Sequence, residues 1–160
     1  MAVTSRMTPT AVRPFQIRGA VGADLDQICD LAGQLLVQIG AHATVQDARR
    51  VLEHILQSPD LGIVLVAENN GQLAGYAYGA YVWRAEFAGE TMDIVAVFVD
   101  PRFRSKGVGG SLVAALLENA RRRGIRRVTV EVHPGNSAIE RTLESSGFDP
   151  ERRTLWGIRI

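Results

Sequence analysis

The stretch that decides the fold is VDPRFRSKGVGGSL, Val99–Leu112, which joins an apolar run to an amphipathic one. Pro101 lacks an amide hydrogen and therefore ends the hydrogen-bond ladder of the strand before it. Glycines at 107, 109 and 110 remove side chains where a helix begins near Val108. The first amides of a helix have no intrahelical partner and lie at the positive end of its dipole. The stretch therefore predicts a strand, a glycine-rich turn and a helix N-terminus that together bind an anion, most naturally phosphate.

Two common phosphate-binding motifs do not fit this stretch. The Walker motif places its lysine after the second glycine, whereas Lys106 precedes Gly107. The dinucleotide motif G-x-G-x-x-G requires glycine at the position of Leu112. What remains is Arg-x-x-Gly-x-Gly, RSKGVG, preceded by FVDP.

The hydrophobic periodicity of the remaining chain predicts an α/β protein with a mixed sheet flanked by about four helices. Strands are expected at 15–20, 61–69, 72–83, 92–100, 125–133 and 153–160, and helices at 23–36, 44–58, 108–124 and 136–148. The pair Asn70–Gly71 between two strands predicts a tight hairpin. The strand, helix and strand of residues 92–132 predict a βαβ unit with parallel strands.

Capping residues and inward faces follow from the same patterns. Asp24 is a possible cap of the first helix and Thr44 the N-cap of the second. The second helix is expected to bury Val45, Ala48, Val51, Leu52, Ile55 and Leu56. In the last strand, Trp156, Ile158 and Ile160 fall on one face and are expected to fill the core or an interface, so a homodimer is possible.

Composition bounds the class of protein. The chain has 160 residues and a net charge of +1, which fits one domain over residues 13–160 after a loose tail at 1–12. Cys29 is the only cysteine, so no internal disulfide forms. No apolar run is long enough to span a bilayer, and we expect a cytoplasmic location. The arginines of RRRGIRR, 121–127, lack interleaved aromatics and favour a helix C-terminus over nucleic-acid binding.

The sequence resembles the GNAT superfamily of N-acetyltransferases. The resemblance rests on RSKGVG with its VDP lead-in, and on Asn136 followed at the usual distance by ESSGF. It implies an acyl-CoA N-acyltransferase fold, in which the strand before the glycine turn splays from the next parallel strand. It also implies acetyl-CoA as co-substrate, an amine acceptor and no metal.

The resemblance assigns cofactor-binding roles to residues of this chain. The strand Val97, Phe98 and Val99 would pair with the pantetheine amides, and Asn136 would bond the pantetheine arm or thiol, although it also fits an N-cap. The pyrophosphate would be held by Arg104, Ser105, Lys106, Gly107, Val108, Gly109, Gly110 and Ser111.

Acetyl transfer needs a neutral amine, a donor for the oxyanion and a thiolate that leaves. An amide near Val97 is the expected donor. Asp93 is the candidate general base, acting through water, with Glu131 and His133 as competitors. The family's usual tyrosine acid, seven residues after the asparagine, is replaced by Leu143.

The acceptor is expected to contact two variable segments, GAHAT around His42 and the hairpin around Trp83, Glu86, Phe87 and Glu90. The sequence thus predicts acetyl transfer to a primary amine of a small molecule or peptide, by direct attack in a ternary complex. Leu143 is the feature that favours the alternative, a non-catalytic acyl-CoA-binding sensor or partner module.

Overall fold

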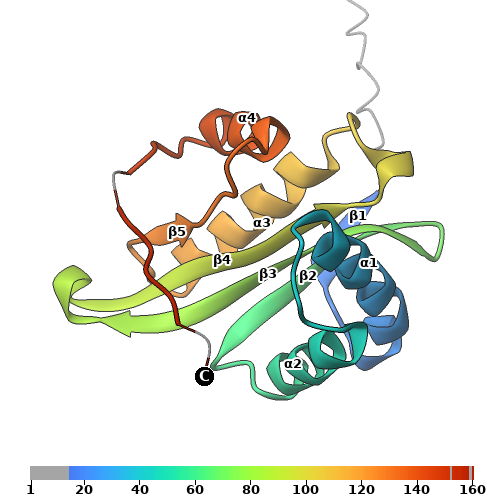
Figure 1. Ribbon diagram of the computed structural model, residues 1–160, viewed down its shortest axis with the longest axis horizontal. Coiled ribbons are helices and arrows are strands. Elements are labelled where there is room, and N and C mark those ends of the chain that lie inside the picture. Colours follow the sequence, from blue (N-terminus) through green and yellow to red (C-terminus); the bar gives the residue numbers. More distant parts are fainter. Residues whose placement is uncertain (1–14, 152, 159) are drawn as a thin grey trace, which may run out of the picture.

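A five-stranded sheet with strand order β1-β2-β3-β4-β5 organises the chain (Figure 1). The computed structural model describes residues 15–151, 153–158 and 160, so the tail expected at 1–12 lies outside it. The strands are β1 (Gln16–Gly19), β2 (Gly62–Asn69), β3 (Gln72–Arg84), β4 (Gly89–Val99) and β5 (Val128–Val130). The first four run antiparallel to their neighbours, and β4 and β5 are parallel. The predicted mixed sheet is confirmed.

Helices cover both faces of the sheet (Figure 1). One pair is α1 (Leu25–Gln38) and α2 (Val45–Gln57), and the other is α3 (Val108–Arg122) and α4 (Ser137–Ser145). Alternate strand residues feed two cores, because side chains of a strand point to opposite faces. Val66, Tyr76 and Phe98 pack with α1 and α2, whereas Met92 and Ile94 pack with α3.

The hairpin between β2 and β3 turns through two residues with positive φ. Asn70 has φ 50° and Gly71 has φ 80°, the pattern of the primed turns that match strand twist. Gln27 of α1 holds this turn with two hydrogen bonds. Its side-chain nitrogen donates to the Gly71 carbonyl at 3.2 Å, and its side-chain oxygen accepts a hydrogen bond from the Leu73 amide at 2.9 Å. The hairpin expected from the sequence is confirmed.

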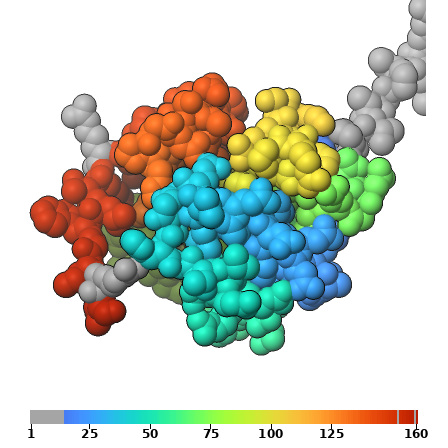
Figure 2. Space-filling view, turned by 45° about the vertical axis from the view of Figure 1, so that its right-hand side comes forward, coloured from blue at the N-terminus to red at the C-terminus, as the bar shows by residue number. Residues whose placement is uncertain are grey.

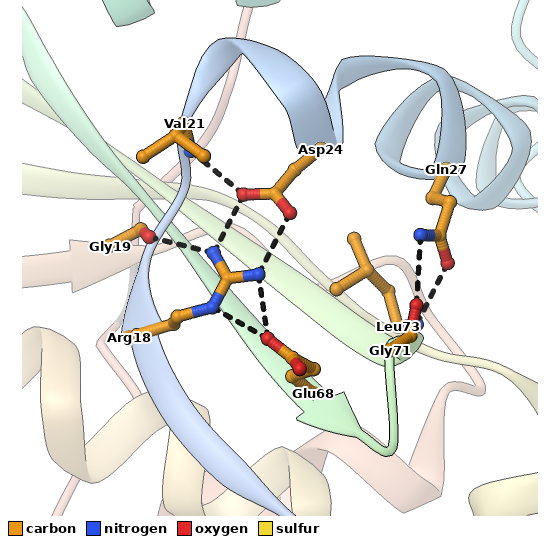
Figure 3. A network of polar contacts seen from close by, with 8 residues as sticks. All are labelled: Arg18, Gly19, Val21, Asp24, Gln27, Glu68, Gly71 and Leu73. Atoms are coloured by element: carbon orange, nitrogen blue, oxygen red, sulfur yellow. Dashed lines mark hydrogen bonds and ion pairs between the residues drawn. The ribbon is translucent and has the colours of Figure 1, made fainter.

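Arg18 joins β1 to β2 and to the start of α1 (Figure 3). Its guanidinium donates to both carboxylate oxygens of Asp24, at 2.7 and 2.8 Å, and its Nε donates to Glu68 at 2.8 Å. Asp24 precedes α1 but accepts no α1 amide; it accepts the Val21 amide at 2.8 Å instead. Asp24 is thus the N-cap residue by position, as expected, but its side chain does not cap α1, because it is turned toward Arg18 and the Val21 amide.

Three other expectations are corrected. Val45 and Val51 of α2 are exposed, because α2 buries only the stripe that includes Leu52 and Ile55. The strand expected at 125–133 is reduced to β5, which ends where β4 leaves it. No strand follows α4 among the residues described, and Trp156 and Ile158 are 89% and 88% exposed, as is Ile160, so none of them fills the core.

None of the described helices has the length and apolar character needed to cross a membrane.

Candidate active site

β4 separates from β5 half-way along its length. The two strands pair only from Met92 to Ile94, opposite Val128–Val130. Directly after this, β4 carries a bulge: Ile94 faces Gly79 of β3 and Ala96 faces Tyr78, so Val95 is an extra residue. The bulge turns the rest of β4 away, and a wedge opens on its β5 side.

The backbone alternation of β4 points polar groups into this wedge. The Asp100 amide donates to Ala74 of β3 at 2.9 Å, whereas the Val99 carbonyl faces the other way and accepts Arg104 Nε at 3.0 Å. In an antiparallel pair, residues alternate in the strand that they face. The amides of Val97 and Val99 therefore face the wedge, where no described strand pairs with them.

The N-terminus of α3 lies at the end of β4 without a side-chain acceptor. Gly107 occupies the N-cap position with φ 79°, and no side chain accepts an α3 amide. The α2 helix is different, because the Thr44 hydroxyl accepts the Asp47 amide and completes a capping box. The positive end of α3 thus remains available for an anion from outside the chain.

The glycines of α3 leave a bare surface beside these amides. A Cβ built at Gly109 would meet only Val99 Cγ2, at 3.6 Å, and one at Gly110 would meet nothing within 4 Å. The packing of the protein therefore does not require glycine at either position. Because both positions lack a side chain, the space next to the first amides of α3 stays open to a ligand.

A cavity of about 860 Å³ brings these features together. Of the twelve residues expected to bind the cofactor, ten line it: Val97, Phe98, Val99, Arg104, Ser105, Gly107, Val108, Gly109, Gly110 and Asn136. Figure 2 shows the loop after β4 (yellow), α4 (orange) and α1 (blue) meeting on one face. Lys106 and Ser111 are not among the lining residues; Lys106 lies over the Phe103 ring, 5.5 Å from its centroid.

Arg104 and Asn136 both line the cavity and are held differently. Arg104 is fixed by the Val99 carbonyl, by Gln38 Oε1 at 3.3 Å and by the Phe98 ring, 5.5 Å below its guanidinium. Asn136 caps α4, because its Oδ1 accepts the Ile139 amide at 3.5 Å. The cap leaves the Asn136 amide nitrogen for a ligand, so its two expected roles are compatible.

The comparison with protein families decides the identity. The model of the Acetyltransferase (GNAT) family matches residues 28–148, well over half of the chain. This chain belongs to the GNAT family. It is therefore an enzyme, an acetyltransferase that moves an acetyl group from acetyl-CoA to an amine.

Individual relatives agree with this family. The phosphinothricin N-acetyltransferase of Streptomyces viridochromogenes is 28% identical over 138 residues, 85% of this chain and 75% of the relative. The L-methionine sulfoximine/L-methionine sulfone acetyltransferase of Salmonella typhimurium is 37% identical over 87 residues, 53% of this chain and 49% of the relative. Among solved structures, an aminoglycoside N-acetyltransferase in complex with CoA has the same fold, with a TM-score of 0.79 at 21% identity over 96% of this chain and 99% of that chain.

Asp93 and Glu86 of this acetyltransferase both contact Arg84, and neither carboxylate is among the residues that line the cavity. Asp93 lies on β4 just before the bulge; its Oδ2 accepts Arg84 at 2.7 Å and its Oδ1 accepts the Thr129 hydroxyl at 2.6 Å. Arg84 also lies 3.9 Å from Glu86, and the charges of Asp93 and Glu131 contribute to the rise of its pKa, which the Asp93 hydrogen bond dominates. Glu131 and His133 are exposed after the end of β5.

The structure places neither a tyrosine nor another acid at the position of Leu143, which is buried in α4. Tyr76 and Tyr78 face α1 and α2, and burial raises the pKa of both hydroxyls. Tyr81 faces the α3 side and donates to Asn119 at 2.7 Å.

The side chains of the two expected acceptor segments differ in how exposed they are and in whether an arginine binds them. His42 lies exposed between α1 and α2, and Trp83 is 78% exposed near the end of β3. Glu90 is bound by Arg123 through two contacts, at 2.7 and 3.0 Å, so it joins the hairpin to the end of α3. Glu86 is exposed, and its nearest charged partner within the described chain is Arg84, at 3.9 Å.

The arginine run at 121–127 is partly used inside the molecule. Arg123 stacks on Tyr81, 4.0 Å from the ring centroid, in addition to its pair with Glu90. Arg127 pairs with Glu151 and lies over Phe87. These contacts tie α3 and the segment after α4 to the β3–β4 hairpin.

Six polar residues that sequence reasoning missed also line the cavity: Gln38, Arg121, Arg141, Thr142, Ser145 and Ser146. Arg121 could have been found, because it follows Gly110, Ala114 and Leu117 on one stripe of α3 at helical spacing. Gln38 reaches the cavity only through the packing of α1 against β4, which no local pattern encodes. Arg141 lies five residues after Asn136, on the same helix.

Proposed function

We propose that the wedge between β4 and β5 binds acetyl-CoA and is the active site. The observation that carries this proposal is the single cavity in which the unpaired edge of β4, the uncapped N-terminus of α3 and Asn136 meet. A pyrophosphate fits α3, because it accepts hydrogen bonds from backbone amides and is stabilised by the dipole. Arg104 and the amides from Arg104 to Gly110, with Lys106 and Ser111 at the rim, hold it.

The edge of β4 binds the pantetheine arm. The amide groups of the arm pair with the backbone of Val97 and Val99 as an added strand would. Asn136, at the start of α4, forms a hydrogen bond with the arm or with the thiol of the cofactor. When bound, acetyl-CoA supplies an activated acetyl thioester. The amide near Val97 donates to the oxygen that becomes negative during transfer, which is the contribution expected of a fixed donor in a dry site.

The acceptor amine attacks directly in a ternary complex. Within the described residues, none that line the cavity is a cysteine, and Cys29 is buried in α1 with its pKa raised by that burial. Direct attack needs a neutral amine, whose usual pKa is about 10.4. Asp93 is the base in this proposal: Arg84 and Thr129 use one acceptor site on each oxygen, and a carboxylate has about four, so room for a water remains.

Departure of the thiolate needs no dedicated acid. A thiol of pKa about 8.5 is a competent leaving group near neutral pH, so the replacement of tyrosine by Leu143 is compatible with turnover. This argument removes the feature that favoured a non-catalytic sensor.

The acceptor is a primary amine of a small molecule or peptide, and a small molecule is the better match. Two relatives are named for small amines, phosphinothricin and L-methionine sulfoximine. The test measures release of CoA with a thiol reagent, with acetyl-CoA and a panel of amino-acid analogues, polyamines, aminoglycosides and peptides. We expect amine-dependent release with at least one small molecule; release with peptides alone would contradict the small-molecule assignment.

The proposal also covers organisation and location. Residues 13–160 act as one domain, supported by the single sheet that both helix pairs cover. The enzyme works in the cytoplasm, for which the free, buried Cys29 is the support. The chain forms a homodimer through its exposed C-terminal segment.

A further inference from the structure

Arg84, at the end of β3, is an arginine whose hydrogen-bonding capacity the fold hardly uses. A guanidinium has five N–H donors, but within the described residues Arg84 makes one hydrogen bond, from Nη2 to Asp93 at 2.7 Å. Arg18, by contrast, makes four (Figure 3). Glu86 lies 3.9 Å from Arg84 Nη1, which is beyond hydrogen-bond distance. Among the described residues, Nε is the only nitrogen of Arg84 that is both buried and without a partner, so the unpaired Nη1 is accessible to a ligand.

The pair formed by Arg84 and Asp93 lies on the face of the sheet opposite α3. Met92 and Ile94 pack with α3, so Asp93 between them points to the other face. The two side chains are 33% and 30% exposed, and Asp93 precedes the Val95 bulge by two residues. In the proposed function the thioester lies in the wedge that opens at this bulge. An acceptor that approaches from the face opposite α3 therefore meets the pair beside the thioester.

Two opposite charges side by side complement a ligand that carries the same two charges close together. In an α-amino acid, one carbon atom bears both the amine and the carboxylate. The carboxylate accepts a charge-assisted hydrogen bond from Arg84 Nη1, and the amine then lies on the Asp93 side of the pair. A diamine has no anion for Arg84, and the terminus of a peptide has a neutral amide in place of the carboxylate. Val95, which is 57% exposed, offers an apolar surface to the rest of the ligand.

We propose that Arg84 binds the carboxylate of the acceptor, and that the acceptor is an α-amino acid whose amine faces Asp93. This inference rests on the proposed function and narrows the acceptor from any small primary amine to one class. It gives Arg84 a role in specificity that is separate from its ion pair with Asp93. The enzyme therefore distinguishes an amino acid from the same molecule with a neutral group in place of the carboxylate.

Release of CoA from acetyl-CoA is measured with L-leucine, L-methionine and L-methionine sulfone, each beside its carboxamide. The carboxamide keeps the size of the acid and removes its charge, and its amine loses a proton at least as readily, so a preference for the acid reports the carboxylate. We expect at least one acid to exceed its carboxamide in kcat/KM by tenfold or more, about the contribution of one hydrogen bond between charged groups.

The variant Arg84→Gln should abolish this preference. The KM for the acid should rise by tenfold or more, whereas kcat/KM for the carboxamide should stay within about threefold of wild type. Arg126→Gln is the matched control, because it removes one exposed positive charge and Asp93 is bound by Arg84 and Thr129 instead. The preference of wild type for the acid is itself a test, which does not depend on how well the variants fold.

Other results would overturn the inference. Equal use of acid and carboxamide by wild type, or release only with amines that lack a carboxylate, shows that no carboxylate is bound. An equal loss for both acceptors in Arg84→Gln shows that Arg84 acts only through Asp93. An equal loss of preference in Arg126→Gln shows that net charge makes the difference. Absence of release with every amine tested removes the proposed function itself, a result distinct from equal use of the two acceptors.

Discussion

Gly109 and Gly110 are bare at a place where a side chain would meet almost no protein atom. Glycine inside a helix costs about 0.5–1 kcal/mol relative to alanine, and the packing around α3 gives no reason for that cost. A ligand that approaches the helix amides is the reason that remains. Stability and binding are therefore expected to respond in opposite directions to substitution here.

The substitution Gly109→Leu tests this opposition. The folded protein should remain as stable as wild type or become slightly more stable, because the new side chain enters the cavity and adds helix propensity. The affinity for CoA should fall by tenfold or more, measured by calorimetry beside thermal melts. Gly89→Leu is the control, since a Cβ there also meets open space but lies outside the cavity. Undiminished CoA binding by the Gly109 variant would remove the anion site.

The proposed role of Asp93 as general base can be separated from its ion pair with Arg84 by two substitutions. Asp93→Asn should lower kcat near neutral pH by about a hundredfold, the lower range for a general base, with little change in the KM for acetyl-CoA. Arg84→Gln is the control, because it breaks the same pair and keeps the carboxylate. Turnover of Asp93→Asn that matches wild type at every pH would exclude Asp93, and an equivalent loss in Glu131→Gln alone would assign the role there.

Asp24 gives the fold a defined dependence on pH. The Arg18 hydrogen bonds, opposed by burial, lower the pKa of Asp24 below its usual value. A group with a lowered pKa stabilises the folded state above its unfolded pKa, near 4, and this stabilisation is lost as the pH falls through the folded value. Asp24→Asn should lower the free energy of unfolding by roughly 1–3 kcal/mol at pH 7. In urea titrations that difference should shrink between about pH 5 and pH 2; a constant difference would contradict the pairing.

At the scale of elements, the caps of α2 and α3 differ because their functions differ. The Thr44 backbone amide and hydroxyl both donate to Asp47, at 2.8 and 2.7 Å, and together with the Arg50 guanidinium they lower the Asp47 pKa to about 2. Thr44→Ala keeps the amide bond and removes the hydroxyl. We expect a loss of about 1 kcal/mol in stability and a rise of the Asp47 pKa that stops short of its usual value, followed by NMR. Unchanged CoA affinity is the internal control, since α2 does not line the cavity.

The sequence predicts those elements whose signals are local. The RSKGVG turn, the Asn70–Gly71 hairpin and the Thr44 cap each follow from a few adjacent residues, and the structure confirms all three. The length of β5 does not follow in this way. Residues 125–133 alternate as a strand throughout, yet pairing stops at Val130 because the Val95 bulge carries β4 away. An alternating sequence therefore forms a strand only where a neighbouring strand is present to pair with it.

The residues of the cavity also fall into those that a local pattern predicts and those that only the packing of the fold brings together. Residues of the glycine turn were identified from the sequence because their chemistry and their spacing coincide. Gln38 and Arg141 come from elements far along the chain, and only the packing of α1 and α4 around β4 brings them to the same space. Asp93 was identified as a carboxylate at the strand, but its contacts with Arg84 and Thr129 depend on two neighbouring strands.

At the scale of the whole molecule, the C-terminal segment is held at its start and carries exposed apolar side chains after that. Glu151 pairs with Arg127, and Arg153 lies over Phe87, 5.6 Å from the ring centroid. These contacts start the segment beside the N-terminal end of β5. Antiparallel pairing with β5 would require the segment to start at the other end of that strand. Among the residues described, β5 pairs with β4 alone, and in the homodimer that we propose the segment of a second copy binds its outer edge.

This geometry predicts a dimer that depends on the last residues. Leu155, Trp156 and Ile158 are each at least 76% exposed in the monomer, and burial of such side chains stabilises an interface by roughly 1.5–3 kcal/mol for a complete side chain. Sedimentation should show a dimer for the full chain and a monomer for a chain ending at Arg153, with the same CoA affinity and a similar melting temperature at low concentration. Trp156→Arg should weaken the dimer without shortening the chain. A truncated chain that stays dimeric would place the interface elsewhere, whereas a full chain that is monomeric at high concentration would show that the exposed segment serves no second copy.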